Sequence, residues 1–211
     1  MDDLLKRAFD VAVGSVALVL LSPVIALTGA LVLLIDGRPV LFHQVRVGRG
    51  GALFTMPKYR TMREAFDETG EPLPDDERVT ALGRFLRRSR LDDLLGLVPV
   101  VAGDMSLVGP RPLPPSVLAG LAGSEERARM RPGLTGLAQV SGNTQLNNQE
   151  KIAIDLHYGR TRSFVGDLAI IFRTLATLIV GARRDEALIA EALRLQHMSG
   201  PATPVAEGSR P

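Results

Sequence analysis

Hydrophobic and polar positions divide the chain into an apolar beginning, a mixed centre and a second apolar stretch near its end. Residues 11–35 carry no charged side chain, and as a straight helix of about 1.5 Å per residue they would reach roughly 37 Å, enough to cross a hydrocarbon core of about 30 Å. Pro23 has no N–H for the carbonyl of Val19, and its ring collides with that carbonyl. The helix is therefore predicted to bend or break at Ser22-Pro23, leaving arms of 11 and 12 residues that are each about one leaflet deep.

Two membrane topologies fit this segment equally well. In a re-entrant hairpin, the arms enter and leave on the same side, and the Ser22 hydroxyl partly satisfies the carbonyl groups that Pro23 exposes. In a kinked spanning helix, the many Lys and Arg residues that follow would place the rest of the chain in the cytoplasm. A cleaved signal peptide is disfavoured because the apolar run is too long. A buried hairpin of a soluble protein would need a larger partner core than this chain offers.

The centre of the chain predicts a small sheet and one basic helix. The stretch PVLFHQVRVGRGGALFTMPKYRTM, residues 39–62, favours two strands around the turn GRGG. Residues 64–77 hold seven carboxylates and two prolines, which predict a surface loop. Leu82, Phe85 and Leu86 follow helical spacing with arginines on the rest of the circumference. This helix is suited to rest on anionic headgroups.

The last third of the chain predicts proline-rich loops and two helical stretches. The prolines of residues 109–115 exclude a helix or a central strand there. A helix is expected near residues 149–158. Residues 166–197 are expected to form a C-terminal amphipathic helical segment, too short and too charged to span, that packs on the core or lies in the membrane interface. Residues 198–211, rich in Pro, Gly, Ser and Ala, are expected to be disordered. The fold class is therefore α+β, mainly helical with a small β-hairpin.

Charge adds a partner class to this picture. Six basic residues and no acid lie within residues 37–63, and five more within residues 78–91, again without an acid. Two cationic blocks beside an apolar segment indicate an anionic partner such as a phospholipid surface, a phosphorylated ligand or nucleic acid, although a solvated face is an equal alternative. Nucleic acid is excluded because no recognised binding module or set of stacking aromatic residues is present. The chain has no Cys, which excludes disulfides, thiolate nucleophiles and cysteine metal sites.

Asp92 and Asp93 are the strongest candidates for chemistry. Their simplest interpretation is structural, because Ser89 three residues before Asp92 resembles a capping box and acids in a first helical turn are favoured by about 0.3–1 kcal/mol each. The same geometry can receive a phosphate. Adjacent carboxylates facing a phosphorylated substrate need a cation such as Mg²⁺, which prefers one or two carboxylates plus phosphate oxygens. A carboxylate can alternatively attack phosphorus to form an acyl phosphate.

Four ordered motifs carry a family resemblance: YRTM, RVTALGRFLRRSRLDDL, GDMSLVGPRP and RPGLTGLAQVSGN. Over about residues 6–177 the chain closely resembles the bacterial sugar transferase family, the monotopic polyprenyl-phosphate phosphoglycosyl transferases that begin assembly of surface polysaccharides and glycoproteins. The resemblance implies that residues 1–36 form a re-entrant membrane helix broken at Ser22-Pro23 and that residues 37–165 form the catalytic domain. It also implies a monotopic protein of the bacterial inner membrane with this domain on the cytoplasmic face. Larger members carry extra spanning helices, so this chain is expected to be a small, catalytic-domain-only form.

The resemblance further implies the reaction and its residues. Family members transfer a phosphosugar from a UDP-sugar to undecaprenyl phosphate, release UMP and require Mg²⁺. Asp92 would be the nucleophile on the β-phosphorus, and Asp92 with Asp93 would hold the Mg²⁺. The phosphate groups would be positioned by residues of the same motifs, namely Lys58, Arg60, Arg88, Arg111 and Gln139.

The carboxylate motif also departs from the family pattern. That pattern is usually Leu-Asp-Glu-Leu-Pro-Gln-Leu followed by Asn, whereas this chain has LDDLLGLVPVV, so Asp93 replaces Glu and is one methylene shorter. The alternative is therefore a catalytically weak lipid-phosphate or nucleotide-sugar binding protein. The sequence does not identify the sugar or the glycan pathway. It leaves the oligomeric state open, with a homodimer as one alternative.

Overall fold

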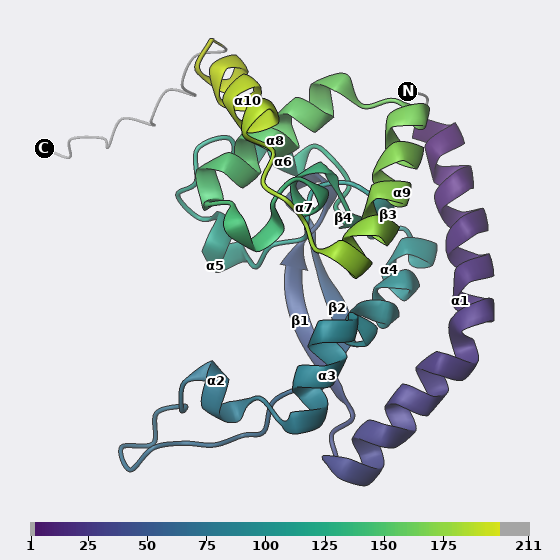
Figure 1. Ribbon diagram of the computed structural model, residues 1–211, viewed down its shortest axis with the longest axis vertical. Coiled ribbons are helices and arrows are strands. Elements are labelled where there is room, and N and C mark those ends of the chain that lie inside the picture. Colours follow the sequence, from purple (N-terminus) through teal and green to yellow (C-terminus); the bar gives the residue numbers. More distant parts are fainter. Residues whose placement is uncertain (1–2, 199–211) are drawn as a thin grey trace, which may run out of the picture. The chain divides into compact units, whose positions relative to one another are not determined.

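The computed structural model describes residues 3–198 and is mainly helical (Figure 1). The chain divides into two compact units. Of the described residues, 3–46 and 53–107 form what we call the N-terminal unit, and 47–52 and 108–198 form the C-terminal unit. The tail predicted to be disordered lies outside the described residues from 199 onward.

The N-terminal unit confirms the predicted hairpin and basic helix. Strands β1 (Leu41–Val47) and β2 (Leu53–Tyr59) pair around the short 3-10 turn η1 (Arg49–Gly51), whose residues are assigned to the C-terminal unit. The next elements follow in this order: α2 (Asp75–Arg78), α3 (Ala81–Ser89), the 3-10 helix η2 (Leu91–Gly96), α4 (Leu97–Ala102) and β3 (Ser106–Val108). The last residue of β3, Val108, is assigned to the C-terminal unit.

The N-terminal helix α1 (Asp3–Ile35) bends but is not interrupted (Figure 1). Pro23 lies inside the helix, so the predicted break into two separate arms is not seen. The Ser22 hydroxyl donates a hydrogen bond of 2.7 Å to the Val19 carbonyl, the group that loses its helical partner because Pro23 has no N–H. The helix can therefore continue through the proline, since the freed carbonyl is satisfied locally.

Both halves of α1 pack within the N-terminal unit. Near its start, Gly14 lies against Val100 of α4, where an added Cβ would approach the Val100 side chain to 3.2 Å. In its second half, Val32 is fully buried in a cluster with Tyr59 of β2 and Leu86 of α3. The opposite side of α1 exposes large apolar side chains, and α1 is long and apolar enough to cross a membrane, the one such helix among residues 3–198. The most exposed of these side chains are Leu4, Val19, Leu20, Leu27, Leu34 and Ile35.

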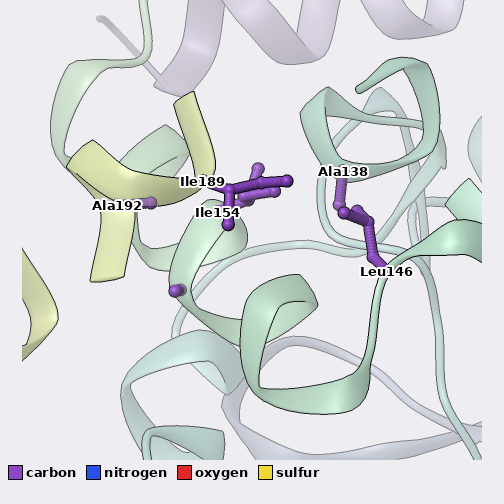
Figure 2. Close-up of a cluster of buried hydrophobic side chains, with 6 residues drawn as sticks. Ala138, Leu146, Ile154, Ile189 and Ala192 are labelled. Atoms are coloured by element: carbon purple, nitrogen blue, oxygen red, sulfur yellow. The ribbon is translucent and has the colours of Figure 1, made fainter. Parts of the chain in front are cut away.

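The C-terminal unit is built around helix α8 (Asn148–Thr161), which confirms the helix predicted near residues 149–158. A capping box begins α8: Glu150 N–H donates to the Asn147 side chain at 2.9 Å, and Asn147 N–H donates to the Glu150 carboxylate at 2.8 Å. Apolar side chains of α7 (Leu137–Val140), α8 and α10 (Glu186–Met198) form a buried cluster (Figure 2). The cluster comprises Ala138, Leu146, Ala153, Ile154, Ile189 and Ala192.

The predicted C-terminal helical segment is two helices. α9 (Phe164–Val180) ends at Gly181, which has φ = 79°, and α10 begins at Glu186. This φ lies in the left-handed region that glycine adopts without penalty, so the helix stops where the sequence supplies Gly181. The remaining elements of this unit are short: α5 (Pro115–Leu118), α6 (Ser124–Ala128), β4 (Gly133–Thr135) and the 3-10 helix η3 (Asn143–Gln145).

Close backbone contact explains Gly109, Gly133 and Gly136. Gly109 N–H donates to the Thr135 carbonyl and Gly133 N–H donates to the Pro110 carbonyl, each at 2.9 Å. A Cβ added to Gly133 would lie 2.1 Å from the Gly109 nitrogen, and one added to Gly136 would lie 2.1 Å from the Gly109 oxygen. Only glycine fits these approaches, and the contact fixes the loop that leads into Arg111.

Candidate active site

The two adjacent carboxylates begin a short helix after a backbone reversal. Arg90 ends α3 in the left-handed conformation, with φ = 60°, and Asp92 and Asp93 lie in the first turn of η2. The Ser89 hydroxyl donates a hydrogen bond of 2.8 Å to the Phe85 carbonyl of α3. It is therefore not directed at η2, which has no side-chain cap. The capping box suggested by the sequence is therefore not formed, and capping does not explain the pair.

Asp93 is held by a lysine from the neighbouring strand. The Lys58 ammonium lies 2.6 Å from Oδ1 of Asp93, and the two side chains are only 16% and 19% exposed. Lys58 comes from β2, which packs against η2. The structure thus brings the predicted Lys58 to the predicted pair Asp92 and Asp93, which lies more than thirty positions later in the sequence.

Asp92 is half-buried, and one of its carboxylate oxygens has no partner among the described residues. Its Oδ1 is inaccessible to solvent and accepts no hydrogen bond within the described residues. Burial raises the pKa of Asp92 and the nearby charge of Asp93 raises it further, while Lys58 and Arg90 lower it. A buried polar atom without a partner is costly, so the Oδ1 of Asp92 is available to accept a bond from a ligand.

The pair fits a divalent cation shared with a substrate. No cluster of three or more His, Cys, Asp or Glu side chains with metal-binding geometry occurs in residues 3–198. Mg²⁺ commonly takes only one or two carboxylates and completes its coordination with waters and substrate phosphates. The free Oδ1 of Asp92 and the carboxylate of Asp93 are therefore suitable ligands in the presence of a phosphorylated substrate.

Two predicted arginines of the N-terminal unit differ in their surroundings. Arg60 donates to the carbonyls of Arg38 at 2.8 Å and Gly37 at 3.1 Å, and also to that of Asp36. It thereby anchors the chain where α1 ends. Arg88 is exposed on α3. Its guanidinium is accessible for a phosphate, whereas that of Arg60 already has three backbone partners.

The other predicted residues, Arg111 and Gln139, lie in the C-terminal unit. The Arg111 carbonyl accepts a hydrogen bond from the Arg127 guanidinium, and Arg127 forms an ion pair of 2.7 Å with Asp155. Gln139 donates a long hydrogen bond of 3.5 Å to the Leu134 carbonyl, while its Oε1 is buried with no partner among the described residues. The backbone at Arg111 is thus held in place by Arg127, and the Oε1 of Gln139 can still accept a hydrogen bond.

No motif in the sequence indicated the Arg127–Asp155 pair. Each side chain is only 5% exposed, and burial raises the pKa of Asp155 while Arg127 lowers it. Asp155 is the single acid of the apolar stretch IAIDL, a position where a charge needs a partner. Arg127 lies in the polar stretch EERARM, which predicts an exposed residue, so the pairing becomes visible only in the folded unit.

Comparison with known proteins assigns the chain to a family. A family model described as bacterial sugar transferase matches residues 1–181. The exopolysaccharide production protein ExoY of Sinorhizobium fredii is 38% identical over 188 residues, which covers 81% of this chain and 83% of the relative. The uncharacterized sugar transferase EpsL of Bacillus subtilis is 39% identical over 178 residues, or 84% of this chain and 88% of the relative.

A third relative is named for its reaction. The UDP-glucose:undecaprenyl-phosphate glucose-1-phosphate transferase of Caulobacter vibrioides is 39% identical over 188 residues, covering 84% of this chain and 70% of that protein.

Proposed function

This chain belongs to the bacterial sugar transferase family, and we propose that it transfers a phosphosugar from a UDP-sugar to undecaprenyl phosphate. The observation that carries the proposal is Asp92, whose buried Oδ1 has no hydrogen-bond partner within residues 3–198 and lies beside the Lys58–Asp93 ion pair. The name of the Caulobacter vibrioides relative supports both the donor class and the lipid acceptor. The product would be the first lipid-linked intermediate of a surface glycan.

The first step would form a covalent intermediate on Asp92. A carboxylate oxygen of Asp92 attacks the β-phosphorus, the bond from this phosphorus to the bridging oxygen breaks, and the bridging oxygen leaves on UMP. Lys58 holds Asp93 in place through the 2.6 Å contact. Bound Mg²⁺, with Asp92 and Asp93 as its protein ligands, would neutralise charge on the diphosphate.

The second step would return Asp92 to its starting form. An oxygen of the lipid phosphate attacks the phosphorus of the acyl phosphate, the Asp92–phosphorus bond breaks, and a lipid diphosphosugar is released. Arginine side chains stabilise the charge on the phosphoryl oxygens in both steps. We assign this role to Arg88, because it is exposed on α3 of the unit that also carries Asp92.

We also propose that α1 enters and leaves the membrane on the same face. Near its start, the Arg7 guanidinium donates to the carbonyls of Val100 at 2.6 Å and Val101 at 2.8 Å. Just beyond its end, the Asp36 carboxylate accepts from the Thr80 hydroxyl at 2.9 Å. All of these groups belong to the N-terminal unit. A helix held at both ends by one unit lies along that unit, which supports a monotopic, re-entrant placement. We assign the catalytic domain to the cytoplasmic face of the inner membrane because the family resemblance implies it.

Cysteine labelling tests this topology directly. The chain contains no Cys, so single cysteines at Leu5 and Arg38, both exposed, are unique reaction sites on either side of the apolar segment. In inside-out membrane vesicles a membrane-impermeant maleimide should label both positions, and in right-side-out vesicles neither. Labelling of the two positions from opposite sides would instead establish a spanning helix.

The pH dependence of transfer should depend on Lys58. Attack requires the ionised carboxylate, so the rate rises as pH increases through the pKa of Asp92, which burial and Asp93 raise. Since Lys58 lowers this pKa, Lys58→Met should move the acid limb of the single-turnover profile to higher pH. Lys58→Arg keeps the positive charge and should leave the limb in place. Identical profiles for both variants and the unaltered protein would contradict the assignment.

The proposed reaction is tested by measuring UMP. The purified protein in nanodiscs, with Mg²⁺ and undecaprenyl phosphate, is incubated with a panel of UDP-sugars. UMP release with one donor would establish the reaction and name the sugar. The alternative, a catalytically weak binding protein, is favoured by Asp93 in place of the family Glu and predicts thermal stabilisation by a ligand without UMP release.

A further inference from the structure

The C-terminal unit contains an open groove that the proposed reaction does not use. Its volume is about 730 Å³, and it lies where α9 ends and α10 begins. Three of its lining residues are arginines: Arg173 from α9, and Arg183 and Arg184 from the α9–α10 linker. The side chains of Val140, Ala176 and Val180 form the apolar part of its wall. A groove with cationic and apolar walls is suited to an anionic, partly apolar ligand.

Among the described residues, two of the three arginines have no carboxylate partner. Arg184 lies 2.6 Å from both Glu150 and Glu186, so its charge is already balanced. Arg173 donates only to the Ser141 hydroxyl, at 3.3 Å, and Arg183 is exposed. Within residues 3–198, therefore, Arg173 and Arg183 bring two unpaired positive charges to the groove.

The two acidic side chains that line the groove, Asp185 and Glu186, already bind other groups of the protein. Asp185 accepts from the backbone N–H of Leu188 at 3.1 Å and so caps the start of α10. Glu186 is bound to Arg184. The negative end of the α9 dipole and the positive end of the α10 dipole both face the linker and offset each other. The remaining attraction for an anion comes from Arg173 and Arg183.

Large apolar side chains continue from the groove along the last turn of α9. Leu178, Ile179 and Val180 are 56%, 88% and 70% exposed. A small anion such as free phosphate would leave these side chains in water. A ligand that carries acyl chains beside its phosphate would cover them, and each buried CH₂ contributes about 0.8 kcal/mol.

We propose that this groove binds the phosphate headgroup of an anionic phospholipid. Arg173 and Arg183 would contact the phosphate, and the acyl chains would lie against Leu178, Ile179 and Val180. The inference uses the membrane association of the family but not the transfer chemistry. The groove would anchor the C-terminal unit to the membrane surface and would favour anionic over zwitterionic lipid.

A fluorescent probe in the groove tests this binding. Because the chain has no Cys, Ala176→Cys places one environment-sensitive dye on the groove wall, and Ala190→Cys places the same dye on an exposed position of α10 outside it. The full chain in detergent is titrated with short-chain phosphatidylglycerol, short-chain phosphatidylcholine or glycerol phosphate. We expect a saturable change from the Ala176 probe with phosphatidylglycerol and a much weaker change with the other two ligands.

Arginine variants identify the binding groups. Arg183→Gln should weaken phosphatidylglycerol binding about fivefold, and Arg173→Gln with Arg183→Gln together more, because each basic residue near an anionic lipid contributes on the order of 1 kcal/mol. Arg194→Gln, an exposed arginine of α10 outside the groove, should leave binding unchanged. Far-UV circular dichroism checks that each variant is folded.

Several results would overturn the proposal. An equal response to phosphatidylcholine would show that charge is not recognised, and an equal response to glycerol phosphate would show a free-phosphate site instead of a lipid site. An unchanged affinity in the folded Arg173 and Arg183 double variant would remove the arginines from the site. The experiment measures lipid binding and not UMP release. The lipid-binding proposal can therefore be supported or overturned whether or not the protein shows transferase activity.

Discussion

Asp92→Asn should abolish sugar-phosphate transfer, with UMP release falling at least about a thousandfold. The amide has nearly the size of the carboxylate but cannot supply the anionic oxygen that attacks phosphorus. The variant should remain folded, because a neutral group replaces a carboxylate whose charged form is disfavoured by burial and by Asp93. UMP release is measured with the donor found in the UDP-sugar panel, and circular dichroism reports the fold.

Two companion variants sharpen this prediction. Glu125→Gln removes an exposed carboxylate of the C-terminal unit and should leave UMP release unchanged. Asp93→Asn removes the partner of Lys58 while keeping the nucleophile, so it should slow transfer less than Asp92→Asn. If Asp92→Asn retained full turnover, the covalent mechanism would be wrong.

Arg127→Met should be the most destabilising single change that we predict. It leaves the carboxylate of Asp155 buried without its ion pair, and such a loss typically costs about 3–5 kcal/mol of unfolding free energy. Arg127 also donates to the Arg111 carbonyl, so transfer should fall even at temperatures where the variant stays folded. Thermal unfolding followed by circular dichroism is the suitable measurement, because the chain has no Trp to report by fluorescence.

A second variant and a pH series show whether Arg127→Met destabilises the protein through loss of the ion pair or through loss of side-chain packing. Arg127→Met with Asp155→Leu removes both charges and should recover much of the lost stability. Burial raises the pKa of Asp155 in the folded protein and Arg127 lowers it. In Arg127→Met alone, this pKa should therefore rise further above its unfolded value. The folded state then binds a proton more readily, so the stability deficit should shrink as pH falls. A deficit independent of pH, with no recovery in the double variant, would contradict the role of the charges.

The sequence correctly predicted those structural elements that are determined by neighbouring residues in the chain. The hairpin at β1 and β2, helix α8 and the position of the carboxylate pair follow from alternation, periodicity and turn residues. The Ser22 hydrogen bond was predicted because its acceptor lies in the preceding turn. The predicted roles of Asp92, Arg88, Arg111 and Gln139 came from motifs and stay predictions for the experiments above.

Contacts between residues far apart in the chain could not be predicted from the sequence pattern. The Lys58–Asp93 pair depends on β2 packing against η2, and the Arg127–Asp155 pair on two helices far apart in the chain. The break predicted at Pro23 became a bend because the local hydroxyl satisfies the Val19 carbonyl. Likewise, Arg60 was expected at a phosphate, but its backbone contacts at the end of α1 could not be inferred from the motif YRTM.

The polar side chains of α1 make its insertion depend on the folding of its own unit. Asp10 is fully buried and accepts the Leu107 N–H at 3.0 Å, and Tyr59 donates its hydroxyl to the Ile25 carbonyl at 2.5 Å. A helix delivered alone would lack the Leu107 N–H that binds the Asp10 carboxylate and the Tyr59 hydroxyl that binds the Ile25 carbonyl inside the apolar segment. The partners come from residues up to Leu107, which leave the ribosome long after α1. Stable insertion should therefore follow synthesis and folding of the N-terminal unit, unlike a spanning helix that inserts first and packs later.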